Sequence, residues 1–267
     1  MTPAPLDLSH SGKPRQVQQN MIAYMSMFSG LPGVTTHDTD SFLFVSNRPA
    51  PGNIILRTDW PAEGVEERID AMFEQMNQLT ERIDWFVFPS DQPSDLGKRL
   101  EARGLPGGRG GNWMWTDLTA LAAAPAIPDG FRIERVRDDD MMAEWTRVSE
   151  EGFEEELAIF YDAYARHAYG ADAFSLHYTG YIGDTPVTSG TLLDAGGCAS
   201  IYDVSTPPAF RGQGYGSAIT HALMQEIARR GYTDTWIWSS DRAQSVYHKL
   251  GYVDVDFGLR EHSWYKS

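Results

Sequence analysis

Three glycines, Gly212, Gly214 and Gly216, alternate with other residues between a strand-like run and a helical one. Glycine lets a backbone turn tightly and approach a ligand without a Cβ clash. The first N–H groups of the following helix have no partner within the helix, and the helix dipole adds partial positive charge there. Arg211 places a fixed charge beside the bend. The bend therefore predicts an anion site that suits a diphosphate.

Other glycine-rich loops fit this segment less well. A Walker A loop ends in Gly-Lys-Ser/Thr, and no lysine occurs between Val204 and Ser217. The dinucleotide fingerprint is G-x-G-x-x-G at the start of a βαβ unit, whereas the spacing here is G-x-G-x-G, late in the chain. The alternative interpretation is a plain tight turn that caps a helix.

The surrounding pattern alternates strand and helix periods. Asp138 is typical of a helix N-cap, and Gly231 is typical of a helix C-terminus. The predicted elements are a strand from Phe131, a helix after Asp138, a helix over 154–169, strands over 174–181, 186–193 and 198–205, a helix over 217–230, a strand over 235–240, a helix over 243–250 and strands over 253–264. This order predicts an α/β fold with a mixed sheet and helices packed on it, of the α+β kind.

The segment 119–130, TALAAAPAIPDG, is rich in small residues and proline, which is typical of a linker. We expect an N-terminal domain over 1–120, a linker over 121–130 and a second domain over 131–267. The first half repeats the end of the second, since Leu100-Glu-Ala-Arg-Gly-Leu parallels Tyr247-His-Lys-Leu-Gly-Tyr. This parallel suggests an internal duplication.

Composition narrows the possible partners and locations. The net charge of −15 disfavours nucleic acid and anionic membranes as partners. One cysteine, Cys198, allows no internal disulfide, and no histidine pair has metal-ligand spacing. No apolar run is long enough for a membrane span or a signal peptide. We expect a cytoplasmic monomer or homodimer without a metal.

Two motifs together resemble the GNAT superfamily of acyl-CoA N-acyltransferases. Arg211-Gly-Gln-Gly-Tyr-Gly resembles its R/Q-x-x-G-x-G/A coenzyme A loop, and the preceding strand exit resembles V-x-V-x-P-x-x-R, with Thr206 in place of the second valine. Ala243-Gln-Ser-Val-Tyr-His-Lys-Leu-Gly-Tyr is similar to A-x-x-x-Y-x-K-L-G-F. The resemblance implies a GNAT fold over 131–267, a degenerate GNAT-like copy over 1–120, and acetyl-CoA as co-substrate of an N-acetyltransferase.

The resemblance also implies roles for residues of this chain. Backbone groups of Val204, Ser205 and Thr206 would bind the pantetheine arm, and an N–H there, that of Val204, would polarise the thioester oxygen. Ser240 stands where many members have Asn and would bind CoA through its hydroxyl. The diphosphate would be held beside Arg211 by amides of the residues Gly212, Gln213, Gly214, Tyr215, Gly216 and Ser217.

Tyr247 is the candidate general acid for the departing thiolate. A phenol has a pKa of about 10 and a thiol of about 8.5, so full proton donation is uphill by roughly 2 kcal/mol. A strong hydrogen bond in the transition state would offset part of that difference. The alternative is a tyrosine that only packs its ring under the sheet.

The sequence leaves the general base open. Asp203 is the better candidate, and His177 is more readily interpreted as a satisfied strand histidine. The acidic run 150–156 could attract a cationic amine, but we favour a solvated helix N-terminus.

The first half lacks the corresponding machinery. Trp60-Pro-Ala-Glu-Gly-Val stands where the diphosphate loop would be, and Leu100 stands where the tyrosine would be. We expect this half to bind no CoA and to wall the acceptor pocket or an interface. The main functional prediction is acetyl transfer to a primary amine of a small, unidentified acceptor. The alternatives are a CoA-binding sensor or pseudoenzyme, a structural protein, and an aminoacyl transferase that uses charged tRNA.

Overall fold

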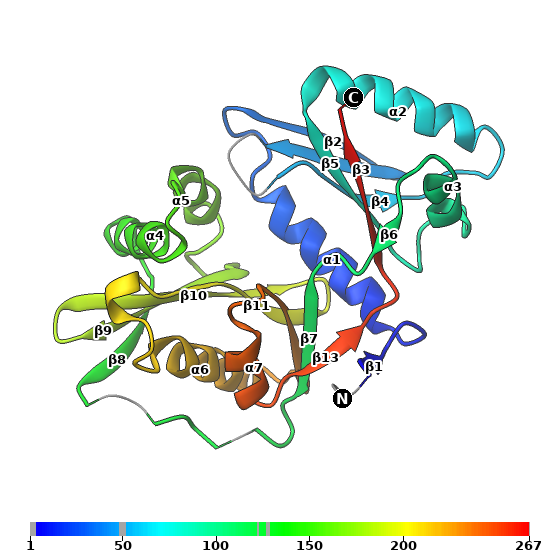
Figure 1. The fold of residues 1–267 in the computed structure, drawn as a ribbon. Coiled ribbons are helices and arrows are strands. Elements are labelled where there is room, and N and C mark those ends of the chain that lie inside the picture. The colour runs from blue at the N-terminus through cyan, green and yellow to red at the C-terminus, as the bar shows by residue number, and fades with distance from the viewer. Residues whose placement is uncertain (1–3, 48–51, 122, 127–128, 267) are drawn as a thin grey trace. The chain divides into compact units, whose positions relative to one another are not determined.

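A computed structural model describes residues 4–47, 52–121, 123–126 and 129–266 of the chain (Figure 1). The chain forms two compact units: unit 1 comprises Met1–Pro5 and Asn112–Val255, and unit 2 comprises Leu6–Gly111 and Asp256–Ser267. These units do not coincide with the segments 1–120 and 131–267 expected from the linker. The reason is an exchange of strands between the two halves of the sequence.

Unit 1 is a mixed sheet with helices on both faces. Its strands are β7 (Asn112–Asp117), β8 (Phe131–Arg135), β9 (Ser175–Ile182), β10 (Thr185–Ala195), β11 (Cys198–Ser205), β12 (Asp234–Ser239) and β13 (Val253–Asp256). They lie in the order β13-β7-β12-β11-β10-β9-β8. Only β11 and β12 pair in parallel; the other neighbours are antiparallel.

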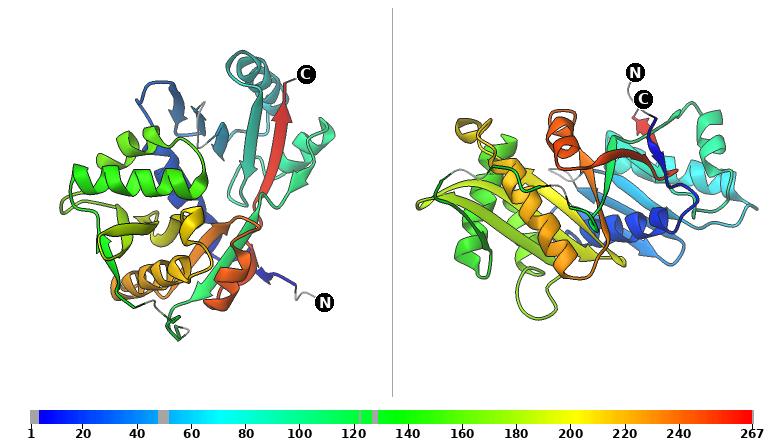
Figure 2. Two further views of the ribbon diagram at one scale, coloured as in Figure 1. Left: turned by 60° about the vertical axis from the view of Figure 1, so that its left-hand side comes forward. Right: turned by 90° about the horizontal axis from the view of Figure 1, so that it is seen from below.

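The helices of unit 1 are α4 (Asp139–Phe153), α5 (Ala158–Ala165), α6 (Tyr215–Arg229) and α7 (Gln244–Lys249), with a 3-10 turn over Pro208–Phe210. Figures 1 and 2 show α4 and α5 on one face of the sheet and α6 and α7 on the other. Asp138 caps α4 as expected, since its side chain accepts a hydrogen bond from the Met141 N–H at 2.9 Å. The helix expected over 154–169 is shorter, because Glu154 ends α4 in a left-handed conformation with φ of 61°.

Unit 2 repeats this plan. Its elements are β1 (Leu6–Asp7), α1 (Lys13–Ser26), β2 (Val34–Thr39), β3 (Phe42–Asn47), β4 (Ile54–Thr58), α2 (Val65–Leu79), β5 (Arg82–Val87), α3 (Leu96–Ala102), β6 (Gly107–Gly108) and β14 (Arg260–Tyr265). The sheet order is β2-β3-β4-β5-β14-β6, and only β4 and β5 are parallel. One apolar core joins α2 and α3 to the face of this sheet that carries Phe44 and Ile55.

The six strands of the second sheet match the run from β9 to β13 of the first, which supports the suggested duplication, whereas β8 and the two-residue β1 at the ends of the eight-stranded sheet have no counterpart. In unit 1 the strand beside β12 is β7, from the first half of the sequence; in unit 2 the strand beside β5 is β14, from the end of the chain. The first half of the sequence therefore contributes β7 and the short β1 to the eight-stranded sheet, and the end of the chain contributes β14 to the six-stranded sheet. Sequence periodicity identifies such strands but not the sheet that they join.

The helix ends that precede β6 and β13 are also alike. The Tyr252 N–H donates to the Tyr247 carbonyl and the Leu105 N–H to the Leu100 carbonyl, both at 3.1 Å. Gly251 and Gly104 take left-handed conformations with φ of 94° and 85°. This arrangement is a Schellman C-cap, in which glycine avoids the Cβ penalty.

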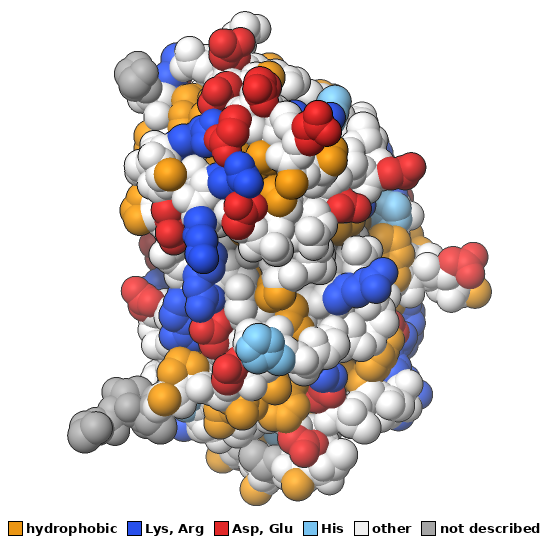
Figure 3. Space-filling model, turned by 90° about the vertical axis from the view of Figure 1, so that its right-hand side faces the viewer, with side chains coloured by type: hydrophobic (Ala, Val, Ile, Leu, Met, Phe, Trp, Pro, Cys, Tyr) orange, Lys and Arg blue, Asp and Glu red, His pale blue; other side chains and the backbone are white. Residues whose placement is uncertain are grey.

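Polar surface in unit 2 is organised in ion pairs. Arg99 of α3 and Arg103, the C-cap residue of α3, pair with Glu66 of α2, and Arg103 also pairs with Asp70 at 3.1 Å. Figure 3 shows acidic and basic side chains interspersed on one face of the molecule. The net negative charge is therefore not gathered into one block on this face.

Candidate active site

The two parallel strands of unit 1 separate soon after they meet. β11 and β12 share a single residue pair, Ser200 opposite Trp236. Their antiparallel neighbours continue with regular pairing, from Asp234 opposite Asp117 to Ser239 opposite Asn112 in the case of β12 and β7. Beyond this pair the two strands diverge. We call the opening between them the fork.

A β-bulge lies on β11 at this fork. Ser189 pairs with Ser205 and Thr191 with Tyr202, so that Asp203 and Val204 both stand opposite Gly190. Asp203 takes the left-handed conformation, with φ of 52°. A bulge interrupts the ladder and re-aims side chains. It lies at Val204, the residue that the family resemblance assigns to the thioester oxygen.

The glycine-rich bend leads into α6 as the sequence suggests. Gly212 and Gly214 have φ of 77° and 89°, which favours glycine over any other residue. Gly214 is the N-cap of α6, and no side chain caps this helix end. The first-turn N–H groups of α6 therefore face outward without a side-chain acceptor, as an anion site requires.

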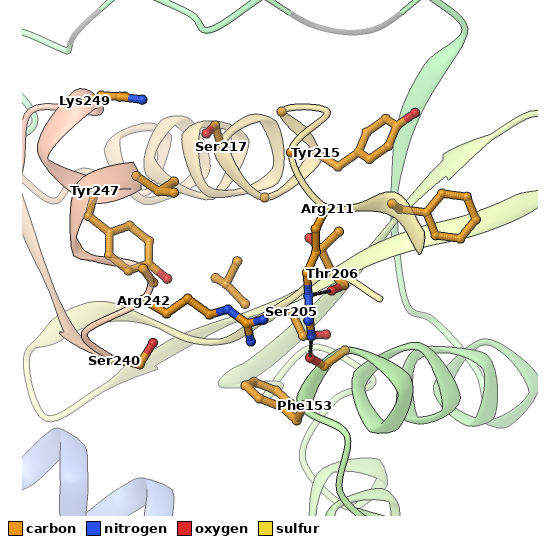
Figure 4. A pocket seen from close by; sticks show the side chains of 18 residues that line it. Phe153, Ser205, Thr206, Arg211, Tyr215, Ser217, Ser240, Arg242, Tyr247 and Lys249 are labelled. Carbon is orange, nitrogen blue, oxygen red and sulfur yellow. Dashed lines mark hydrogen bonds between the residues drawn. The ribbon is translucent and has the colours of Figure 1, made fainter. Parts of the chain in front are cut away.

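A cavity of about 510 Å³ lies between this bend, the fork and α7 (Figure 4). Most of the residues predicted for CoA binding line it. The lining comprises Gly152, Phe153, Val204, Ser205, Thr206, Phe210, Arg211, Gly212, Gly214, Tyr215, Gly216, Ser217, Ser240, Arg242, Ala243, Val246, Tyr247 and Lys249. Residues 36 positions apart, Arg211 and Tyr247, thus share one site.

Two predicted site residues lie outside the lining. The Gln213 side chain donates to the Ala209 carbonyl at 3.4 Å and accepts from the Tyr215 hydroxyl at 3.3 Å. The Tyr215 ring packs on Phe131 and Phe210, and in Figure 4 it points away from the cavity. The second predicted residue outside the cavity lining is Asp203, which contacts Tyr164 of α5.

The Arg211 side chain is held by hydrogen bonds within the protein. Its guanidinium donates to the Thr206 carbonyl at 3.0 Å, to the Gly152 carbonyl at 2.7 Å and to Glu154 at 3.1 Å. Arg211 thereby ties the exit of β11 to the end of α4. Sequence reasoning assigned it to the diphosphate; the contacts show that it also shapes the cavity wall.

The wall between α4 and β11 leaves no room for a side chain at Gly152. A Cβ there would lie 2.5 Å from Ser205 Oγ and 3.0 Å from the Thr206 nitrogen. Ser205 Oγ in turn bonds to Ser189 Oγ at 2.7 Å, and Ser189 Oγ bonds to Ser149 Oγ of α4 at 2.8 Å. Direct backbone contact and a serine network therefore fix the fork to α4.

Tyr247 lies in α7, 5% exposed, with its ring edge-on to Tyr252 at 5.8 Å between centroids. Its hydroxyl points into the cavity in Figure 4. Burial raises the pKa of Tyr247 well above its ordinary value, so the phenol keeps its proton at neutral pH. A phenol in this position can donate a hydrogen bond to a thiolate but is not a base.

Two cationic side chains of the cavity were not predicted as site residues from the sequence. Arg242 and Lys249 line it, and in Figure 4 the Arg242 guanidinium extends across it toward Ser205. Arg242 directly precedes the motif Ala243–Tyr252, and a basic residue at that position is the signal that could have identified it. No Asp, Glu or His is among the lining residues.

The two candidate bases lie on the α4/α5 side of β11. Asp203 Oδ2 accepts a hydrogen bond from the Tyr164 hydroxyl at 2.7 Å. His177 is fully buried and bonds to Ser175 at 2.9 Å and Thr191 at 2.9 Å. Burial lowers the pKa of His177 to about 3, so it is neutral and satisfied, as the sequence favoured.

The acidic run has local partners, although not at the expected helix N-terminus. Glu150 lies in the last turn of α4 and accepts from the Leu157 N–H at 2.9 Å, and Glu154 pairs with Arg211. Within the described residues, no group of three or more His, Cys, Asp or Glu is placed to hold a metal. None of the described helices is long and apolar enough to cross a membrane.

Comparison with known proteins identifies the fold. Residues 189–262 match the family of FR47-like proteins. A 72-residue stretch is 31% identical to an uncharacterized N-acetyltransferase, ycf52, of Pyropia yezoensis, and covers 27% of this chain and 41% of that protein. The C-terminal region is therefore similar to FR47-like proteins and to an N-acetyltransferase.

A second relative is also an N-acetyltransferase. A 68-residue stretch is 31% identical to the ribosomal protein bS18 alanine N-acetyltransferase of Haemophilus ducreyi, and covers 24% of this chain and 45% of that enzyme. The chain thus spans less than half of the length of each of these two relatives.

Solved structures extend the likeness to both units. A GCN5-related N-acetyltransferase from Kribbella flavida aligns with a TM-score of 0.63 at 14% identity, over 92% of this chain and 94% of that one. A tandem GNAT protein from the clavulanic acid biosynthesis pathway aligns with a TM-score of 0.60 at 13% identity, over 98% and 96%. The fold is that of a tandem GNAT protein, as expected from the sequence.

Proposed function

We propose that the chain is an acetyl-CoA-dependent N-acetyltransferase that acts on a primary amine of a small acceptor. The observation that carries this proposal is the open cavity of unit 1, which joins an uncapped helix N-terminus, a strand fork and a buried phenol. The three parts match a diphosphate, a pantetheine arm and a leaving thiolate.

CoA would lie along the fork. Amides of the bend and of the first turn of α6 would hold the diphosphate, with Ser217 in that turn. Arg242 and Lys249 would add charge, because each lines the cavity. The pantetheine arm is uncharged, and it would pair with main-chain groups of Val204 to Thr206, where β11 and β12 have separated.

The transfer joins the amine nitrogen to the thioester carbon and breaks the carbon–sulfur bond. An N–H at the bulge, that of Val204, would stabilise the tetrahedral oxyanion. Tyr247 would donate its proton to the departing sulfur and regain one from solvent. The amine loses its protons to Asp203 or to water, so the net products are an amide, CoA and one proton.

Burial of Tyr247 affects both partners of this donation. It makes the phenol a weaker acid, but a thiolate formed in the same cavity is also a stronger base than in water, since both anions lose solvation. The hydrogen bond in the transition state is therefore retained despite the raised pKa.

Release of free thiol from acetyl-CoA, measured with a panel of primary amines, tests the proposal. We expect Tyr247→Phe to lower kcat by roughly 10²- to 10³-fold with little change in CoA affinity. Tyr252→Phe is the matched control, because Tyr252 is equally buried but does not line the cavity. CoA binding without turnover of any amine by the native protein would favour the sensor or pseudoenzyme alternative.

The remaining predictions are part of the same proposal. These are a cytoplasmic location, a monomer or homodimer, no metal, and no nucleic-acid or membrane partner. The acidic net charge supports the last of them.

A further inference from the structure

Arg242 is a cation of the cavity that has no counter-charge. It lines the cavity, and none of the residues that the structure describes forms a hydrogen bond or an ion pair with its guanidinium (Figure 4). Arg211, by contrast, is held by the carbonyls of Thr206 and Gly152 and by Glu154. A cavity lined by charges of one sign concentrates ligands of the opposite sign. Arg242 is therefore available to a negative group of a bound ligand.

The Arg242 guanidinium is directed to the fork and not to the glycine-rich bend. In Figure 4 it extends toward Ser205 of β11 and away from Ser217 in the first turn of α6. Ser205 is fixed in position, because its Oγ bonds to Ser189 Oγ at 2.7 Å. In the proposed binding mode the diphosphate lies at the bend and the pantetheine arm lies along the fork. The guanidinium thus faces the part of CoA that carries the sulfur.

Arg242 and Tyr247 reach the cavity from successive turns of the chain around α7. Arg242 is bonded to Ala243, whose carbonyl accepts a hydrogen bond from the Tyr247 N–H at 3.3 Å. One turn of an α-helix rises roughly 5.4 Å, so the two side chains start about that far apart along the axis. The Tyr247 hydroxyl points into the cavity, and among the described residues it has no hydrogen-bond partner. Two hydrogen-bond donors without acceptors therefore meet at one end of the cavity.

The phenol by itself stabilises a leaving thiolate only weakly. Burial raises the pKa of Tyr247, so its proton stays on oxygen while the carbon–sulfur bond breaks. A cation within about 4–6 Å of an acid lowers the pKa of that acid by roughly 1–3 units, and thiols beside arginine follow this rule. Arginine keeps its proton at any ordinary pH, so its charge is present throughout the reaction.

We infer that Arg242 is a second catalytic residue, which stabilises the CoA thiolate as it leaves. Its guanidinium would pair with the sulfur anion, and Tyr247 would donate a hydrogen bond to the same atom. The carbonyl carbon keeps its new bond to nitrogen, the carbon–sulfur bond breaks, and sulfur retains the electron pair until Tyr247 or water supplies a proton. Arg242 itself forms and breaks no covalent bond. This inference rests on the proposed function and adds a residue to its chemistry.

Lys249 provides the matched comparison. It is also a cation that lines the cavity, but it is the last residue of α7, whereas Arg242 precedes the helix. In Figure 4 its ammonium group points toward the side of α6 that carries Ser217, and not toward Ser205. The charge of Lys249 therefore belongs to the phosphate end of the cavity.

The test is the pKa of the CoA thiol in the CoA-saturated protein, measured by a carbon NMR titration of the labelled methylene group that carries the sulfur. We expect this pKa to be about one unit higher in Arg242→Gln than in the native protein, which is about tenfold less thiolate at a given pH below both values. Arg242→Lys should retain most of the native value, because it keeps the charge. Lys249→Gln should weaken CoA binding and leave the thiol pKa unchanged.

Two results would overturn the inference. One is an equal thiol pKa in the native protein and in Arg242→Gln. The other is an equal rise in Lys249→Gln, since the effect would then come from the charge of the whole cavity. Because every measurement is made at saturation, a loss of CoA affinity does not alter the readout.

The outcomes for the two proposals are separable, because this readout needs no turnover. If the protein binds CoA and acetylates no amine, the proposed function fails, and the thiol pKa still decides whether Arg242 stabilises the thiolate. If the protein binds no CoA at saturating concentration, both proposals are wrong.

Discussion

Units 1 and 2 contain the same strand fork, and they use it differently. In unit 1, β11 and β12 share one pair and then separate around a cavity. In unit 2, β4 and β5 share the pairs Ile54–Asp84 and Ile55–Trp85, and a further bridge joins Asp59 to Gln92 beyond them. The second fork is thus closed again at its open end.

Side chains fill the fork of unit 2. Trp60 is buried, stacks on Phe42 at 5.1 Å and meets Trp85 edge-on at 5.7 Å. Asp91 is buried beside it and accepts hydrogen bonds from Gln18 of α1 at 2.8 Å and from the Phe88 N–H at 2.9 Å. In unit 1 the corresponding bend carries glycines. One scaffold can therefore form a ligand site or extra core, according to the size of the residues in the fork.

The largest expected effect is on the filled fork. Trp60→Ala should cost unit 2 roughly 3–5 kcal/mol of stability, because it removes a large buried ring. If CoA binds in the cavity of unit 1 as proposed, its affinity, measured by calorimetry, should stay within twofold of the native value, since Trp60 does not line that cavity. Stability is measured by hydrogen exchange of unit 2 amides. A marked loss of CoA affinity in a folded variant would contradict the division of roles.

The open fork is sensitive at Gly152. At an exposed helix site Gly→Ala stabilises by up to about 1 kcal/mol. Here the Cβ would lie 2.5 Å from Ser205 Oγ, so we expect Gly152→Ala to destabilise by roughly 1–3 kcal/mol and to weaken CoA binding. Gly12→Ala is the control, because nothing lies within 4 Å of a Cβ there. If Gly152→Ala instead stabilised the protein, the contact between α4 and β11 would be able to rearrange around the added methyl group.

The buried carboxyl of the filled fork predicts a pH dependence. Burial raises the pKa of Asp91 to about 7 from an ordinary value of 3.8. The folded state therefore binds the proton more tightly, and the stability due to this group is full below pH 3.8 and is lost as the pH rises through about 7. In Asp91→Asn this dependence should disappear.

Denaturation of both proteins at pH 5 and pH 8 measures this effect. The difference in unfolding free energy between native protein and Asp91→Asn should fall by roughly 2 kcal/mol between the two values. An unchanged difference would show that Asp91 is ionised without cost in the folded state.

The smallest effect expected is that of a cavity cation. Arg242→Gln should weaken CoA binding about fivefold at low salt, and less at high salt, because screening reduces the contribution of an exposed charge. Arg229→Gln is the control, since Arg229 is exposed at the far end of α6 and does not line the cavity. If both variants lost the same amount of CoA affinity at low and at high salt, Arg242 would not contribute to CoA binding.

Local patterns in the sequence predicted most elements and most of the residues that line the candidate site. The glycine-rich bend and the motif around Tyr247 could be predicted because each is defined by a few consecutive residues. The bulge at Asp203 could not be predicted in this way, since it is defined by the register of β11 against β10. Arg211 was identified by its charge, but its structural contacts to α4 are tertiary.

The exchanged strand has a consequence for synthesis of the protein. β14 lies between β5 and β6, so the sheet of unit 2 lacks an interior strand until residues 260–265 have been translated. A nascent chain that already contains all of β2 to β6 would expose two unpaired strand edges for the time needed to make the rest. We therefore expect neither half to be obtainable by cutting the gene at a single point, and a peptide over 256–267 to complement a chain that ends before it.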